Sequence, residues 1–136
     1  MTKAEQFTAA ATAIIAEYKK AVAPMLAIHA KFSARWQEAD GAAVDAQKAY
    51  DAADADYYAK VKPTPKALQT GEYKRVKQEW ETRKAELLKP VEAAYKARSK
   101  ADMLVNLAAV PIVRMQAAAR MKIYKAFLSV YNLPQL

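Results

Sequence analysis

Cysteine is absent from this 136-residue chain, and glycine occurs only twice, at Gly41 and Gly71. Without cysteine there is no disulfide framework and no thiolate to act as a nucleophile or a metal ligand. Two isolated glycines cannot form the glycine-rich loop that cradles phosphate groups. The single histidine, His29, has no glutamate three positions before it, the spacing that helical di-iron sites use. These absences predict a protein that is not an enzyme, with no catalytic residue, no cofactor and no bound metal.

Long hydrophobic runs are absent as well. The longest uncharged and mainly apolar stretch is 103–113, and it contains Asn106 and Pro111. A helix that crosses a bilayer needs about 20 apolar residues, so we expect no transmembrane helix. The lack of cysteine fits a reducing compartment, and we expect a location in the cytoplasm or within a viral particle.

Alanine dominates what is present. It occurs 32 times, lysine and glutamate are common, and runs of β-branched residues are few. This composition is typical of long helices. A chain of this length is also of the size of one domain. The composition therefore predicts an all-α protein with a single helical domain over residues 1–136.

A heptad pattern of apolar residues extends from Ile15 to Tyr57. It has two lines that alternate at spacings of three and four, like the a and d positions of a coiled coil. The first line is Ile15, Val22, His29, Trp36, Ala43, Tyr50 and Tyr57, and the second is Tyr18, Met25, Phe32, Ala39, Ala46 and Ala53. Six repeats predict a long helix that packs against another helix in a left-handed supercoil. We place this first arm at 3–60, after a capping box formed by Thr2 and Glu5.

Two prolines in three residues, Pro63 and Pro65, predict a turn at 61–66, because neither can lie inside a helix. The second arm, 67–110, would then return antiparallel to the first and form a long, coiled-coil-like helical hairpin. Thr70-Gly71-Glu72 offers a later start for this arm.

Three further prolines fall inside the predicted helices. We expect a kink without a break at Pro24, because the heptad pattern continues through it, and a kink or a break at Pro90 and Pro111. The antiparallel register is predicted by setting large side chains against small ones, as close packing requires. In that register Trp80 faces Ala53, and Trp36 faces Ala97.

The segment 111–131 is predicted to form an amphipathic C-terminal helix that is apolar over most of its circumference. One apolar line is Ile112, Met115, Ala119, Ile123, Phe127 and Val130, and the other is Val113, Ala117, Met121, Tyr124, Leu128 and Tyr131. A helix of this kind must be covered from two sides, and one antiparallel arm covers only one. We therefore expect a subunit interface formed by Ile112, Met115, Ile123, Phe127 and Val130. Folding back into a compact bundle and contact with a membrane surface are the alternatives.

The net charge of +8 is concentrated in the second half, because residues 1–60 carry −1 and residues 61–136 carry +9. This asymmetry indicates an anionic partner, such as nucleic acid, anionic lipid or an acidic protein surface. The candidate nucleic-acid-binding residues are Lys74, Arg75, Lys77, Arg83 and Lys84. Tyrosines and Trp80 near the turn could stack on single-stranded bases. Interspersed glutamates favour instead ordinary pairing on a helix surface, with the aromatic residues packing the tip of the hairpin.

These patterns predict a structural or assembly component that forms a homo-oligomer or docks into a larger protein complex through its last helix. A virion or phage particle is one example of such a complex. The first alternative is an accessory protein that binds nucleic acid independently of sequence through the basic second arm. The second alternative is a peripheral membrane or pore-associated protein. No motif identifies the partner or the number of subunits.

Overall fold

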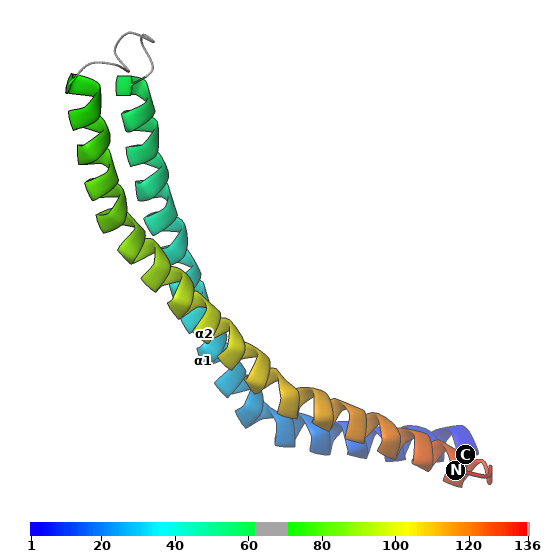
Figure 1. Ribbon diagram of the computed structural model, residues 1–136. Coiled ribbons are helices and arrows are strands. Elements are labelled where there is room, and N and C mark those ends of the chain that lie inside the picture. Colours follow the sequence, from blue (N-terminus) through cyan, green and yellow to red (C-terminus); the bar gives the residue numbers. More distant parts are fainter. Residues whose placement is uncertain (62–70, 136) are drawn as a thin grey trace. The chain divides into compact units, whose positions relative to one another are not determined.

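The structure is a computed structural model that describes residues 1–61 and 71–135, and it contains two long helices (Figure 1). Helix α1 spans Lys3–Val61 and helix α2 spans Gly71–Val130. No strand occurs in these two described ranges. The predicted all-α class is therefore confirmed. The predicted turn at 61–66 lies, after its first residue, outside the described residues, as do residues 67–70.

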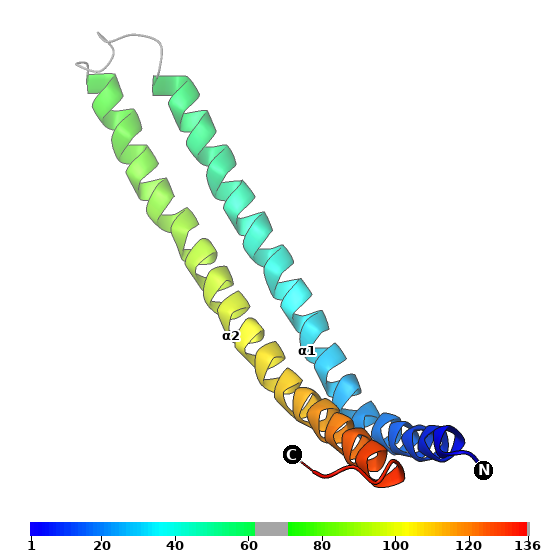
Figure 2. The ribbon, with the colours of Figure 1, turned by 90° about the vertical axis from the view of Figure 1, so that its right-hand side faces the viewer.

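The chain forms two compact units, and each contains a segment of both helices. The terminal unit comprises Met1–Ser33 and Met103–Leu136, and the central unit comprises Ala34–Asp102. Within each unit the two segments lie side by side and run antiparallel (Figures 1 and 2). This pairing confirms the predicted helical hairpin.

Both helices continue through their internal prolines. Helix α1 is unbroken at Pro24, where we expected a bend without a break, and helix α2 is unbroken at Pro90 and Pro111, where we expected a kink or a break. A proline removes one backbone hydrogen bond, and the neighbouring turns of so long a helix retain theirs. The predicted second arm and C-terminal helix are thus one element, with no break near residue 111. The kinks at the prolines stay a prediction.

The predicted heptad seam of α1 agrees with the observed burial at every position but one. The buried or half-buried positions are Tyr18, Val22, Met25, His29, Phe32, Trp36, Ala39, Ala43, Ala46, Tyr50, Ala53 and Tyr57. The exception is Ile15, which is exposed, while its neighbour Ile14 is half-buried. The seam of α1 therefore faces α2, as the heptad pattern predicts.

The exception at Ile15 marks a local change of period. From Ile14 the covered residues proceed to Tyr18 and Val22, two successive steps of four. Helix α2 has the same irregularity, from Met115 through Ala119 to Ile123. Such a step locally unwinds a left-handed supercoil, because an 11-residue repeat matches a straighter pair of helices than a 7-residue repeat does. The two irregularities lie opposite each other in the terminal unit, so the pairing stays in register.

Helix α1 begins with a side-chain cap, and helix α2 ends with a backbone cap. The backbone N–H of Glu5 donates to Thr2 Oγ1 at 3.1 Å, and the N–H of Thr2 donates to Glu5 Oε2 at 3.3 Å. This confirms the predicted capping box. At the other end Asn132 adopts φ 53°, and the N–H of Leu133 donates to the carbonyl of Leu128 at 2.8 Å. Together with the bond from Asn132 to Ser129, this forms a Schellman motif.

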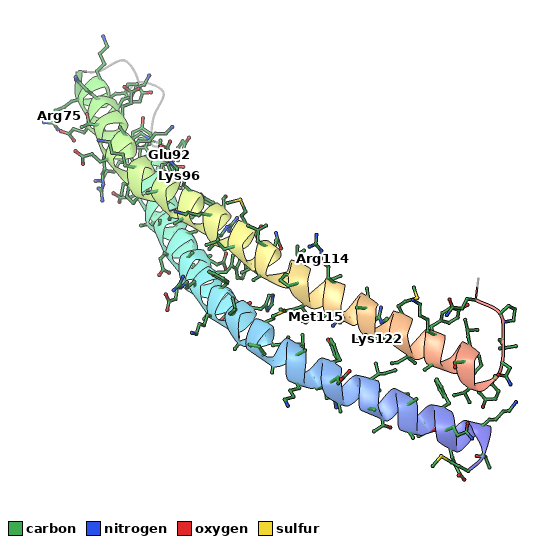
Figure 3. The ribbon with its side chains drawn as sticks, turned by 90° about the horizontal axis from the view of Figure 1, so that it is seen from below. Arg75, Glu92, Lys96, Arg114, Met115 and Lys122 are labelled. Carbon is green, nitrogen blue, oxygen red and sulfur yellow. The ribbon has the colours of Figure 1, made fainter. Side chains whose placement is uncertain are left out.

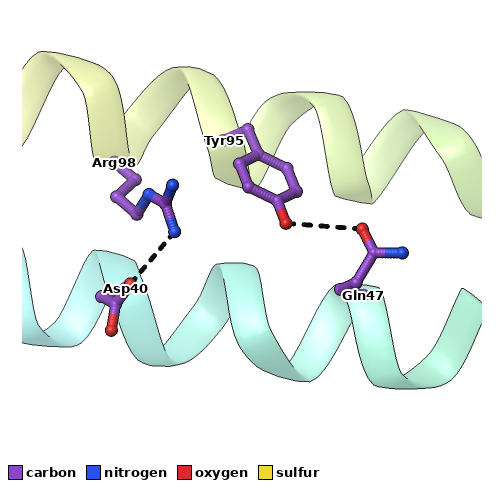
Figure 4. Close-up of polar contacts among 4 residues, drawn as sticks. All are labelled: Asp40, Gln47, Tyr95 and Arg98. Carbon is purple, nitrogen blue, oxygen red and sulfur yellow. Dashed lines mark hydrogen bonds and ion pairs between the residues drawn. The ribbon is translucent and has the colours of Figure 1, made fainter.

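Polar contacts between the helices add to the seam in the central unit. Arg98 Nη1 lies 3.2 Å from Asp40 Oδ1, and the Tyr95 hydroxyl lies 3.4 Å from Gln47 Oε1 (Figure 4). The Arg98 guanidinium also lies 4.9 Å from the centre of the Tyr95 ring. Ala97, which the predicted register placed against Trp36, is exposed instead. The long side chain of Arg98 covers this part of the seam.

Candidate functional site

The most unusual surface of the terminal unit is a line of exposed apolar side chains on α2. Five of its six members are large and between 41 and 60% exposed, with Leu107 the most exposed. We call this line the outer stripe, and it consists of Met103, Leu107, Val110, Ala117, Met121 and Tyr124. Exposed leucine or methionine residues are ordinary when they occur singly. A line of them at regular spacing indicates a contact surface.

The outer stripe has the spacing of a coiled-coil seam. Its members follow one another at four, three, seven, four and three residues. The same 3–4 alternation in the seam between α1 and α2 buries one helix against another. From Met103 to Tyr124 the stripe covers 22 positions, about 33 Å along the helix at 1.5 Å per residue. Its narrow width and heptad period fit a partner helix better than a flat surface.

Basic residues border the outer stripe. Arg114 falls at the gap in its spacing, between Val110 and Ala117, and it projects away from α1 (Figure 3). Arg120 and Lys125 are also exposed on this part of α2. The segment 103–136 contains four Arg or Lys residues and no Asp or Glu. The surface therefore combines apolar contact area with positive charge.

The predicted subunit-interface residues lie on the other side of α2, toward α1. Ile112 is only 8% exposed, and Ile123 and Val130 are half-buried. Met115 lines a groove between the helices, and Phe127 makes an edge-to-face contact with Phe7, with ring centres 5.4 Å apart. Helix α1 therefore covers most of these five residues, whereas Phe127 stays 38% exposed. Their role as a subunit interface stays a prediction. The other apolar line supplies Ala117, Met121 and Tyr124 of the outer stripe.

Met103, Leu107 and Val110 were not among the predicted interface residues. The signal that identifies them is a second heptad phase in residues 103–124, offset from the phase that contains Ile112. The helix boundary predicted at residue 111 divides this pattern between two elements. The unbroken α2 joins them into one line.

A groove of about 380 Å³ lies between the helices of the terminal unit, where the period of both seams changes. Met115 and Lys122 contribute to it from α2 (Figure 3). Its other lining residues are Ile14, Glu17, Tyr18, Ala21, Ala118 and Ala119. The alanines leave the groove open because their side chains are too short to fill the space between the backbones. It contains one acid, Glu17, and one base, Lys122, but no histidine, serine or threonine.

The aromatic residues near the tip pack against one another in the central unit. Trp80 is 9% exposed, and its ring is stacked on that of Tyr57, with centres 5.2 Å apart and an interplanar angle of 15°. The ring of Tyr50 is tilted by 47° to that of Trp80, with centres 6.2 Å apart. Trp80 therefore sits beside the buried Ala53, as the predicted register requires. Its face is not free to stack on a nucleic-acid base.

Burial within this aromatic cluster raises the pKa of the Tyr57 hydroxyl above its usual value of about 10, and the neighbouring Tyr73 raises it further. The folded state therefore favours the neutral phenol. The resulting stabilisation is present below pH 10 and is lost as the pH rises through the raised pKa. We expect the free energy of unfolding to decrease in that alkaline range as Tyr57 ionises.

Tyrosine absorbance and circular dichroism, followed together from pH 8 to 12, measure this transition. Tyr57→Phe should reduce this decrease in stability, because the phenylalanine cannot ionise. Tyr58→Phe is the matched control, because Tyr58 is adjacent but 58% exposed. Equal behaviour of the two variants would contradict the role of Tyr57.

The predicted nucleic-acid-binding residues are exposed on α2 of the central unit. Arg75 lies 4.0 Å from Glu79, four positions along the same helix. Arg75 and Arg83 also border a shallow surface groove together with Glu79 and Glu86. The remaining predicted residues are Lys74, Lys77 and Lys84, which are also exposed. Acidic side chains thus interrupt this positive surface, and phosphate binding there stays a prediction.

Other kinds of site find little support in the described part of the chain. His29 is half-buried on the seam, and no three His, Asp or Glu side chains within residues 1–61 and 71–135 gather closely enough to hold a metal ion. Neither α1 nor α2, over the same residues, contains a stretch apolar enough to cross a bilayer.

The outer stripe is thus the surface whose exposure most needs a functional explanation. Comparisons of the chain with protein-family models, with curated protein sequences and with solved structures found no match.

Proposed function

We propose that this protein is a non-enzymatic structural component that assembles with other helices through the outer stripe of α2. The observation that carries the proposal is the exposure of five large apolar side chains at heptad spacing along one face. Burying one such side chain contributes about 1.5–3 kcal/mol. Exposure of all five is therefore unfavourable for an isolated chain and favours association.

The thin core of each unit supports the same proposal. Seven hydrophobic residues of the described chain are buried, and three of them are far apart along α1: Val22, Ala43 and Ala53. Two antiparallel helices bury one stripe each, which leaves their remaining faces in contact with water. A third helix packed on the outer stripe would add a second seam to α2. Proteins built from long helices gain stability in this way when they assemble.

Replacing one residue of the stripe by a charge tests the proposal. Leu107→Asp should raise the dissociation constant for self-association about a hundredfold or more, because a carboxylate would be buried in an apolar contact. The helicity and thermal midpoint of the monomer should not change, since Leu107 is 60% exposed. Sedimentation equilibrium measures the association, and circular dichroism measures the fold.

Gln116→Asp is the matched control, because Gln116 is exposed on the same helix but lies outside the stripe. It should associate like the wild type. A wild type that stays monomeric at high concentration would contradict the proposal. If that monomer bound anionic liposomes and Leu107→Asp released it, the stripe would serve a membrane surface instead.

A further inference from the structure

We infer that the outer stripe of one copy binds the exposed acidic face of α1 in the central unit of a second copy. This inference rests on the proposed function and specifies the partner. The acidic face is defined by the exposed residues Gly41, Val44, Lys48, Ala52, Ala55 and Ala59, bordered by Glu38, Asp45, Asp51 and Asp56. It lies on the side of α1 away from the buried seam residues Ala43 and Ala53.

The two surfaces are complementary in size. The outer stripe presents leucine, methionine, valine and tyrosine, whereas the acidic face presents mainly alanine and glycine. Large side chains on one helix fill the space above small residues on the other, which allows close packing at native density. The members of the acidic face follow one another at three, four, four, three and four residues. This spacing lets α1 accept a partner helix along a line of comparable length.

The two surfaces are also complementary in charge. Residues 38–56 contain six acids and one base, Lys48, whereas the stripe is bordered by Arg114, Arg120 and Lys125. Arg114 falls within the heptad line, so a partner helix would partly desolvate its guanidinium. A partly buried guanidinium needs a carboxylate partner. Asp45, Asp51 and Asp56 are exposed and can provide one from a second copy. Asp56 would then exchange its ion pair with Lys60, at 3.3 Å, and Asp51 can accept from the guanidinium beside its bond from Gln47.

Charge also distinguishes this face from the other alanine-rich face of α1. In the terminal unit the outward side of α1 includes Ala9, Ala13, Ala16, Ala23 and Ala27. The small side chains of this face would pack against the large side chains of the outer stripe equally well. However, residues 1–33 contain four lysines and two glutamates, and Lys20 lies on that outward side. Like charges would then oppose each other across the contact, which disfavours this pairing.

The contact joins two different surfaces, and each copy carries both. One copy can therefore bind two neighbours, so association extends beyond a dimer unless the same two copies satisfy both contacts. Added salt should weaken the association between copies, because it screens the exposed charges that border both surfaces.

Charge reversal tests the pairing. The first variant carries Asp45→Lys, Asp51→Lys and Asp56→Lys, and the second carries Arg114→Glu, Arg120→Glu and Lys125→Glu. Alone, each should self-associate at least tenfold more weakly than the wild type, because like charges then face each other in every contact. An equimolar mixture should regain wild-type association, because every contact between unlike copies is then complementary. Sedimentation velocity on separately labelled variants measures homotypic and heterotypic association.

The possible outcomes separate this inference from the proposed function. Restoration by mixing supports the pairing. If Leu107→Asp abolishes self-association but the mixture is no better than either variant alone, the assembly function stands and this pairing is wrong. If both charge-reversed variants associate like the wild type, the pairing is also wrong. Circular dichroism verifies that each variant folds, and Asp→Asn and Arg→Gln versions should show the same weakening to a smaller extent if the charges act through the contact.

Discussion

Replacing Trp80 by alanine is expected to lower the free energy of unfolding by about 3–5 kcal/mol, the usual cost of removing a buried aromatic side chain. Trp80 is the largest buried side chain of the central unit, and it contacts both Tyr50 and Tyr57. Its neighbour across the seam is Ala53, which cannot fill the resulting cavity. Because small domains are stable by only about 5–15 kcal/mol, this loss is a large fraction of the total, and we expect a marked decrease in the urea midpoint of the variant.

Urea denaturation followed by circular dichroism and by tyrosine fluorescence measures this effect. Tyr58→Ala is the control, because Tyr58 is an aromatic residue of the same cluster that is mostly exposed. This substitution should lower the free energy of unfolding by less than about 1 kcal/mol. Equal costs for the two variants would contradict the view that the aromatic residues form the core of the central unit.

The second large effect is expected in the terminal unit, where two adjacent residues have opposite environments. Ile112→Ala should lower the free energy of unfolding of the monomer by about 2–5 kcal/mol, because Ile112 is 8% exposed and the shorter side chain leaves a cavity. Val113→Ala should change the stability of the monomer by less than about 0.5 kcal/mol, because Val113 is 59% exposed. The pair thus tests which face of α2 is covered by α1.

Thermal unfolding of both variants at low protein concentration gives the comparison without a contribution from assembly. A larger loss for Val113→Ala than for Ile112→Ala would mean that α2 is rotated about its axis relative to this structure. In that case the outer stripe would be part of the core, and the proposed interface would disappear.

Local sequence signals were sufficient for the helices and their caps. Helix composition, the capping box at Thr2 and the end of α2 near Asn132 depend on residues within a few positions of each other. The seam of α1 was also predictable, because only one of its faces carries a sustained heptad pattern. The error at Ile15 arose where the period changes, since Ile14 and Ile15 are equally apolar and the 7-residue pattern fits the second of them.

The breaks expected at prolines show where local rules were insufficient. A proline disfavours a helix at one position, whereas packing along many turns favours its continuation. In α2 the helix therefore continues through Pro90 and Pro111. This continuity, which is a property of the whole paired helix, places Met103, Leu107 and Val110 in line with Met121 and Tyr124.

The sequence by itself determined that this protein is helical, that its two arms pair antiparallel, and that α2 has more apolar surface than one partner helix can cover. Only the tertiary structure decided which of the two apolar lines of α2 faces α1. Both lines have similar hydrophobicity, so neither composition nor period distinguishes them. The choice depends on the rotation of α2 about its axis, which is determined by the fit of its side chains against those of α1. That fit buries Ile112 of the first line and leaves Val113 and Met121 of the second line exposed.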